Sequence, residues 1–209
     1  MNRKPVVGVI GAIGGGKSTV ARRLAELGGA HVDADAVGHE VLREPAIKAR
    51  VVERFGKDVV GVNGDIDRKR LGKIVFSGPG LLDSLERMMH PRMMEIFHER
   101  IAAAQNDAAV KLVVFDAAIL LEAGWGDMMD VILYVDADRA SREDRVKSRG
   151  WTPKELARRE AAQMPAEQKK ARANFVINNN GDWEALRSEV DALFRRWTAP
   201  ERATAKAGA

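Results

Sequence analysis

Short apolar runs alternate with longer segments of helical periodicity along the chain. The runs are rich in Val, Ile and Leu, as buried strands are, and they cover residues 6–10, 30–35, 111–116, 131–136 and 175–178. Apolar residues at helical spacing cover residues 19–27, 36–101, 139–149, 153–173 and 183–197. Because strands alternate with helices, the pattern predicts an α/β fold whose parallel sheet is covered by helices on both faces.

Glycine-rich breaks divide the longest helical region. Gly61–Gly64 and Gly78–Gly80 interrupt the pattern between residues 36 and 101. The segment Leu81–Met89 reads as one of the resulting helices, ended by His90-Pro91. A long helical insertion between the strands of an α/β core is typical of a substrate-binding module.

The segment after the first apolar run carries the most specific motif. Gly11-Ala-Ile-Gly-Gly-Gly-Lys-Ser18 fits the phosphate-loop pattern G-x-x-x-x-G-K-[ST] in full, between a predicted strand and a predicted helix. The backbone N–H groups of such a loop wrap a polyphosphate at a helix N-terminus, where the helix dipole favours an anion. Lys17 is expected to reach the β- and γ-phosphates, and the Ser18 hydroxyl to ligate Mg²⁺. The motif predicts that the chain binds a nucleoside triphosphate.

Acidic residues end the other predicted strands, where ligands of parallel sheets bind. Asp33 and Asp35 lie two apart on a segment expected to be extended, so their side chains would leave one face. One of them could accept the proton of an acceptor hydroxyl; alternatively, either could cap a helix that begins near Ala36. Asp116 occupies the Walker B position and could bind Mg²⁺ through water, or could be a strand-end turn residue. Asp136 is expected to be structural.

Arginines lie on one face of the predicted helix at residues 139–149. Arg142, Arg145 and Arg149 stand at positions i, i+3 and i+7. Such a face is often merely solvated, but a helix beside a nucleotide-binding sheet could act as a mobile lid that brings cations over the transferring phosphate. Lys169, Lys170 and Arg172 could add to such a lid, but most of them are expected to be surface charge.

The composition excludes several classes of protein. A chain of 209 residues without cysteine can bury a core as one α/β unit and has no disulfide or thiolate metal site. Its 34 basic and 30 acidic residues are well mixed, so the net charge of +4 indicates no nucleic-acid partner. No apolar run is long enough for a signal peptide or a membrane span, and we therefore expect a cytoplasmic protein that binds no membrane.

A set of short motifs extends from Val6 to about Trp197. It consists of Gly11–Thr19, Val32–Asp35, Ile66–Leu71, Val75-Phe76, Met89–Pro91, Leu120–Glu122, Arg145, Arg149, Gln163 and Phe175–Gly181. In this order the motifs resemble the dephospho-CoA kinase family, which phosphorylates the ribose 3′-hydroxyl of dephospho-CoA with ATP. The phosphate loop alone is shared by many kinases and GTPases, whereas the ordered set is specific.

The resemblance implies a three-layer P-loop kinase fold and assigns roles to individual residues. Catalysis would fall to Asp35 as the base, Lys17 and Arg145. The implied ATP site comprises Gly11, Ala12, Ile13, Gly14, Gly15, Gly16, Lys17, Ser18, Thr19, Arg145, Arg149 and Asn179, of which Asn179 would lie near the adenine. The implied acceptor site comprises Asp35, Arg68, His90, Leu120 and Glu122. Mg²⁺ would be held by Ser18 and Asp116, and dephospho-CoA would be the partner substrate.

The expected organisation is one domain over residues 1–209, as a monomer or weak homo-oligomer. It would contain a helical acceptor-binding insertion at residues 36–105, a lid at about 142–172 and a frayed tail at 198–209. The family usually has glycine where this chain has Ala12, which is compatible with ATP binding if the backbone there keeps a negative φ. It also commonly has proline before Leu-Leu, where this chain has Ala118-Ile119, and often arginine at the position of Met94.

Two alternatives stay open. The first is another phosphate-loop kinase that acts on a nucleotide or a small alcohol. The second is a nucleotide-switched binding protein, such as a regulatory GTPase or a nucleic-acid-associated NTPase. The chain has no Asn-Lys-x-Asp guanine motif, and aromatic residues are only 5% of it, which disfavours stacking platforms for bases.

Overall fold

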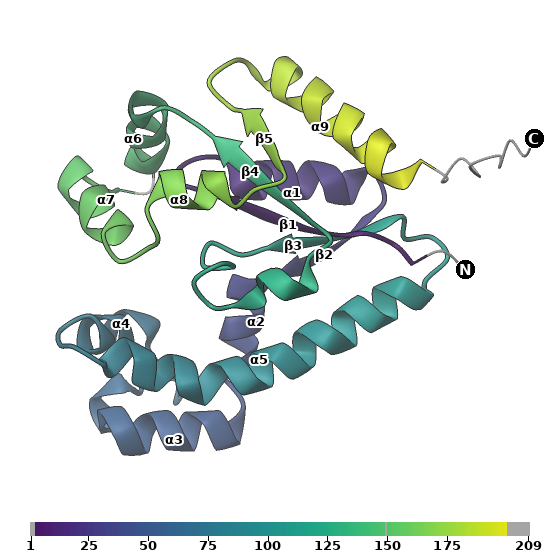
Figure 1. The fold of residues 1–209 in the computed structure, drawn as a ribbon. Helices are drawn as coiled ribbons and strands as arrows, with labels where there is room; N and C mark the ends of the chain where they lie inside the picture. The colour runs from purple at the N-terminus through teal and green to yellow at the C-terminus, as the bar shows by residue number, and fades with distance from the viewer. Residues whose placement is uncertain (1–2, 149, 200–209) are drawn as a thin grey trace, which may run out of the picture. The chain divides into compact units, whose positions relative to one another are not determined.

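A five-stranded sheet forms the centre of the computed structural model, which describes residues 3–148 and 150–199. The strands are β1 (Val6–Gly11), β2 (Gly29–Asp33), β3 (Leu112–Asp116), β4 (Val131–Asp136) and β5 (Phe175–Asn178). Their order in the sheet is β2-β3-β1-β4-β5, and the β1–β3, β1–β4 and β4–β5 pairs are parallel (Figure 1). The predicted α/β fold is confirmed.

The helices follow the predicted order. They are α1 (Lys17–Glu26), α2 (Ala34–Val41), α3 (Pro45–Phe55), α4 (Arg68–Val75), α5 (Leu81–Asn106), α6 (Arg139–Lys147), α7 (Pro153–Glu160), α8 (Ala166–Ala171) and α9 (Trp183–Thr198), with short 3₁₀ turns η1 (Lys57–Val59) and η2 (Trp125–Met128). The region predicted as one helix over residues 153–173 is two helices. Pro165, which has no N–H to donate, stands at the N-cap of α8 and separates it from α7.

Helix α5 does not end where the sequence pattern suggested. The prediction that His90-Pro91 ends a helix at Met89 is wrong, because α5 continues for 26 residues with Pro91 inside it. Proline removes one helical hydrogen bond, but the apolar stripe of the helix extends past it. Its members on both sides are buried: Met89, Met93, Ile96 and Phe97. Burial of this stripe outweighs the missing bond.

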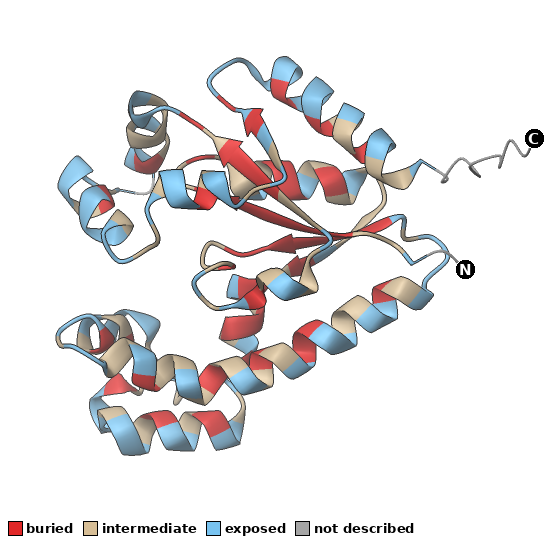
Figure 2. Cartoon of the chain, viewed as in Figure 1, coloured by how far each residue is buried: buried red, intermediate tan, exposed pale blue. Residues whose placement is uncertain are grey.

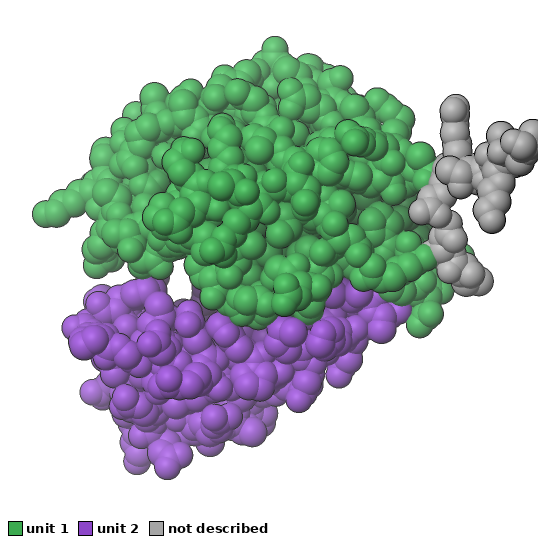
Figure 3. Space-filling view, viewed as in Figure 1, with its two compact units in different colours: residues 1–32, 104–209 green, residues 33–103 purple. Residues whose placement is uncertain are grey.

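The chain divides into two compact units, coloured separately in Figure 3. Unit 1 comprises Met1–Val32 and Ala104–Ala209 and contains most of the sheet, whereas unit 2 comprises Asp33–Ala103. Unit 2 contains α2, α3, α4 and most of α5. The insertion expected at residues 36–105 overlaps unit 2, and its acceptor-binding role stays a prediction.

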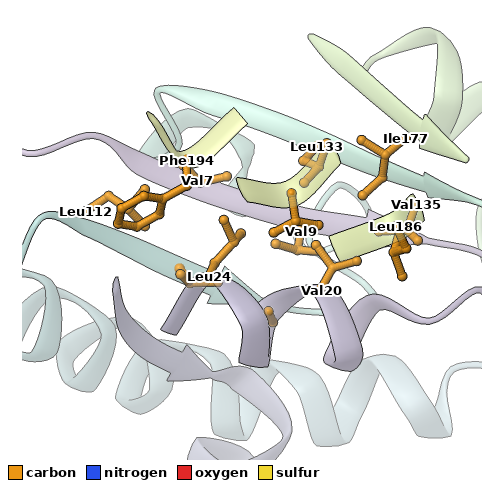
Figure 4. Packing of buried hydrophobic residues seen from close by; sticks show 13 residues of the cluster. Val7, Val9, Val20, Leu24, Leu112, Leu133, Val135, Ile177, Leu186 and Phe194 are labelled. Atoms are coloured by element: carbon orange, nitrogen blue, oxygen red, sulfur yellow. The ribbon is translucent and has the colours of Figure 1, made fainter. Parts of the chain in front are cut away.

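The core of unit 1 lies between the sheet and two helices that are far apart in sequence. Figure 4 shows Val7 and Val9 of β1 beside Val20 and Leu24 of α1 and Phe194 of α9. All five side chains are at most 5% exposed, and Figure 2 shows the buried positions concentrated on the strands. Since α1 is anchored along its length by this core, its first turn, which follows the phosphate loop, is held in place.

Helix α9 ends at Thr198, and residues 200–209, most of the expected tail, lie outside the described residues. Within the part of the chain that the structure describes, no helix has both the length and the apolar character needed to cross a bilayer.

An ion pair fastens α1 to α9 at the edge of the core. Arg23 Nε donates to Asp191 Oδ1 at 2.7 Å, and Arg23 Nη2 donates to Asp191 Oδ2 at 2.8 Å. This two-pronged geometry is the strongest arrangement for an arginine–carboxylate pair. Hydrogen bonds from the Arg23 guanidinium lower the pKa of the Asp191 carboxyl below its ordinary value.

We expect Asp191→Asn to lower the melting temperature more at neutral pH than in acid. A carboxyl whose folded-state pKa is lowered stabilises the fold above its unfolded pKa of about 3.9. That stabilisation is lost as the pH falls through the lowered folded value. Thermal unfolding followed by circular dichroism at about pH 7 and about pH 3 measures the difference in melting temperature between wild type and variant. The control is Glu184→Gln on the same helix, and an equal gap at both pH values would contradict the assignment.

Candidate active site

The phosphate loop joins β1 to α1 in a conformation that its glycines permit. Gly15 N–H donates to the Ala12 carbonyl at 2.9 Å and closes the turn. Gly14 and Gly16 adopt φ values of 80° and 98°, which side chains with a Cβ rarely tolerate. No described residue other than glycine has a positive φ, so Ala12 meets the condition stated for its position.

The same glycines leave room for neighbouring segments to approach closely. A Cβ on Gly14 would lie 2.8 Å from the backbone carbonyl oxygen of Arg142, and a Cβ on Gly16 would overlap the side-chain nitrogen of Asn179. Helix α6 and the end of β5 therefore pack directly on the loop. This close packing brings the predicted lid helix and Asn179 to the phosphate-binding segment.

Lys17 and Asp116 lie beside each other at the base of the loop. Lys17 Nζ is 3.9 Å from Asp116 Oδ1, and His31 Nε2 is 3.9 Å from Asp116 Oδ2. Asp116 ends β3 and is only 7% exposed, whereas Ser18 in the first turn of α1 is exposed. The Lys17 ammonium, the buried Asp116 carboxylate and the exposed Ser18 residue thus lie next to the phosphate loop. A nucleotide bound with Mg²⁺ requires a cation, a carboxylate and a hydroxyl of this kind.

Two of the three predicted lid arginines contact the loop. Arg142 and Arg145, one helical turn apart on α6, donate to loop carbonyls: Arg142 Nη1 to Ile13 at 3.5 Å, and Arg145 Nη1 to Gly14 at 3.3 Å. Arg142 also pairs with Glu160 of α7. Arg149 lies outside the described residues. The shared face predicted for Arg142 and Arg145 is therefore confirmed.

A buried lysine, which the sequence suggested was surface charge, connects the far end of the lid region to β3. Lys169 is 1% exposed. Its Nζ pairs with Glu122 Oε1 at 2.7 Å and donates to the Ala118 carbonyl at 2.8 Å and to Gln163 Oε1 at 3.2 Å. Lys169 is an exception to the surface charge expected of most of these residues, because the segment Gln163–Lys169 folds back onto the residues that follow β3. The sequence contained no signal that distinguishes Lys169 from its neighbour Lys170.

Three further residues singled out from the sequence, Asp136, Leu120 and Glu122, lie in unit 1. Asp136 accepts a hydrogen bond from Lys170 Nζ at 2.6 Å, which fits the structural role expected for it. Leu120 is fully buried, and a Cβ on Gly8 of β1 would lie 2.7 Å from its Cδ1. The Glu122 side chain is 23% exposed and also accepts from Met164 N–H at 3.0 Å. Acceptor contacts by Leu120 and Glu122 stay predictions.

In unit 2 the two neighbouring aspartates have different environments. The segment is not extended through Asp35, because α2 begins at Ala34. Asp33 is the N-cap of this helix and accepts from Ala36 N–H at 3.0 Å, as one of the alternatives proposed. Asp35 lies in the first turn and is exposed. One oxygen of the Asp33 carboxylate thus serves the helix cap, whereas the Asp35 side chain is exposed at the start of the helix.

Unit 2 also contains Arg68 and His90. Arg68 is the first residue of α4, which Asp67 caps. The distance from Arg68 Nη1 to His39 Nδ1 is 3.5 Å. His90 sits within α5, and burial lowers the pKa of its imidazole. A lowered pKa keeps the imidazole of His90 neutral near pH 7. Both residues are candidates for an acceptor site within this unit.

The comparisons with known proteins agree with these features. The family model described as dephospho-CoA kinase matches residues 5–185. The chain is 40% identical over 191 residues to the dephospho-CoA kinase of Thermobifida fusca, covering 90% of this chain and 94% of the relative. It is 36% identical to that of Geobacter sulfurreducens, covering 91% and 98%. The crystal structure of TT1252 from Thermus thermophilus superposes with a TM-score of 0.79 at 33% identity, covering 93% of this chain and 98% of that one.

The Lys169 network yields a stability prediction. Lys169→Met removes an ammonium that bonds the Glu122 carboxylate, the Ala118 carbonyl and the Gln163 amide oxygen, and a buried acceptor left without its donor typically costs about 1–3 kcal/mol. We expect a clear loss of stability in urea unfolding followed by tryptophan fluorescence. The matched control is Lys170→Met: its partner side chains are 38% and 32% exposed, and pairs at the surface contribute at most about 1 kcal/mol. Equal losses for the two lysines would refute a special role for Lys169.

Proposed function

The chain belongs to the dephospho-CoA kinase family and is therefore an ATP-dependent kinase of dephospho-CoA in coenzyme A synthesis; from this premise we propose which of its residues perform the reaction. The observation that carries the proposal is the ordered phosphate loop, with Lys17 in the helical turn that directly follows it and Arg145 donating to its Gly14 and Gly15 carbonyls. Phosphoryl transfer depends mainly on positioning and on neutralising the charge of the moving group. Lys17 and Arg145 would supply this neutralisation from two sides.

The nucleotide would lie along the loop with its phosphates at the N-terminus of α1. The loop residues Gly11–Gly16 would donate backbone N–H groups to the phosphate oxygens, and Lys17 would contact the β- and γ-phosphates. Ser18 and Asp116 would hold Mg²⁺, Asp116 through water. Bound there, Mg²⁺ would offset the negative charge of the phosphates during phosphoryl transfer.

Asp35 would accept the proton of the ribose 3′-hydroxyl of dephospho-CoA. Its carboxylate is exposed and at the start of α2, whereas that of Asp33 is committed to the cap. This difference supports Asp35 over Asp33 as the base. Arg68 and His90 would contribute to acceptor binding from the same unit. We further propose that the enzyme works in the cytoplasm as a monomer or weak homo-oligomer, without a nucleic-acid or membrane partner.

Asp35→Asn is expected to lower kcat for dephospho-CoA phosphorylation by about 10²–10⁴-fold, the usual contribution of a general base. ATP binding should be retained, because the substitution is outside the phosphate loop. ADP release from ATP and Mg²⁺, with and without dephospho-CoA, measures the stimulation by the acceptor.

The matched control is Asp33→Asn, because asparagine is an equally good N-cap and should preserve both the helix and the activity. Loss of activity in Asp33→Asn with full activity in Asp35→Asn would transfer the base to Asp33. An absence of stimulation by dephospho-CoA in the wild type would contradict the acceptor itself.

Ser18→Ala is expected to raise the Mg²⁺ concentration needed for half-maximal activity by about tenfold or more, as the loss of one ligand or its support typically does. Ser18→Thr should restore the wild-type requirement, because the phosphate-loop motif accepts either hydroxyl at this position. Activity titrated with MgCl₂ at saturating ATP tests both variants. An unchanged requirement in Ser18→Ala would exclude Ser18 as a Mg²⁺ ligand.

A further inference from the structure

The carbonyl side of the phosphate loop is held by Asn179, one residue beyond β5. Asn179 is 7% exposed, and its Nδ2 donates to the Gly15 carbonyl at 2.8 Å. We infer that Asn179 is a positioning residue that sets the conformation of the phosphate loop and the location of Arg145. The inference rests on the proposed function for its kinetic consequences, but its geometric basis does not depend on the acceptor.

Asn179 is itself fixed by the sheet. β5 pairs with β4 through Asp136 and Asn178, and the Asn179 N–H donates to the Asp136 carbonyl at 2.7 Å, which extends the ladder by one residue. The side chain is thus attached to a rigid strand end. A donor at a fixed position can impose a geometry on a glycine-rich loop that has little stiffness of its own.

The backbone of Asn179 holds the lid arginine as well. Arg145 Nη2 donates to the Asn179 carbonyl oxygen at 2.6 Å, while Arg145 Nη1 lies 3.3 Å from the Gly14 carbonyl and 3.4 Å from the Gly15 carbonyl. The Gly15 carbonyl therefore receives donors from both Asn179 and Arg145. Since the two side chains share one acceptor, displacement of Asn179 would disturb the loop and the arginine together.

The Asn179 side chain also fills the space beside Gly16 of the loop. A Cβ on Gly16 would overlap Asn179 Nδ2, so the amide fills the position that a side chain on Gly16 would otherwise take. Gly16 is the N-cap residue of α1 and has no side chain to cap the helix. Asn179 thus packs at the point where the loop becomes the helix, next to the N–H groups expected to receive phosphate.

This role differs from the adenine contact that the sequence resemblance implied for Asn179. A side chain that recognises the base should discriminate between nucleotides and should be indifferent to a ligand without a base. A side chain that positions the loop should affect every polyphosphate alike. Inorganic tripolyphosphate, which has no adenine, therefore separates the two roles.

The test compares Asn179→Ala and Asn179→Asp with wild type by calorimetric binding of ATP, GTP and tripolyphosphate. Asn179→Asp keeps the size of the side chain but replaces the donor by an oxygen facing the Gly15 carbonyl. We expect both variants to bind all three ligands more weakly, by a similar factor of about ten to a hundred. This is the range for losing a hydrogen bond to a buried group. Steady-state kinetics should show a fall in kcat for dephospho-CoA phosphorylation in addition to a higher KM for ATP.

A double-mutant cycle tests the link to the arginine. If Asn179 acts partly through Arg145, the loss in kcat for Asn179→Ala combined with Arg145→Ala will be smaller than the product of the two single losses. The matched control is Val176→Ala, because Val176 lies on β5 three residues before Asn179 and is 46% exposed. Its binding of all three ligands should stay within about twofold of wild type, as for surface substitutions.

Three outcomes would overturn the inference. The first is unchanged tripolyphosphate binding with altered preference between ATP and GTP, which would make Asn179 a base contact. The second is full affinity in Asn179→Asp, which would show that only side-chain size matters. The third is an equal loss in Val176→Ala. Failure of dephospho-CoA to stimulate the wild type would contradict the proposed acceptor and leave the tripolyphosphate result standing.

Discussion

A phosphate loop that offers its N–H groups to an anion needs donors for its carbonyl oxygens, and the surrounding structure of unit 1 is built to supply them. The Gly15 carbonyl receives Asn179, the Gly14 carbonyl receives Arg145, and the Ile13 carbonyl receives Arg142. These donors come from the end of β5 and from α6. The loop is thus a meeting point of segments that are distant in sequence, and its shape depends on their placement.

Three further ion pairs of unit 1 hold those segments in place. Lys169 joins α8 to the residues after β3, and Lys170 joins it to the end of β4. Glu160 pairs with Arg142 and so connects α7 to α6. The region from α6 to α8 is therefore attached at one end by buried or partly buried charges, while Arg142 and Arg145 contact the phosphate loop. A lid needs both an anchored end and a face directed at the substrate.

Much of the candidate site could be predicted because its chemistry is local in sequence. The eight residues of the phosphate loop specify strand, turn and helix start by themselves, and Arg142 and Arg145 share a face because helical spacing requires it. The roles of Asp33 and Asp35 could not be separated in this way. Whether α2 begins at Ala34 or near Ala36 decides which carboxylate caps the helix, and boundary positions depend on packing.

The sequence by itself determined the α/β alternation, the phosphate loop and the family, since each depends on short-range pattern. Only the tertiary structure decided that α5 passes through Pro91, that Lys169 is buried and that Asn179 supports the loop. Each of these outcomes depends on a partner more than 40 residues away or on a buried stripe that compensates for a local defect. Local propensity contains no information about such partners, because burial and long-range hydrogen bonds exist only once the chain has folded.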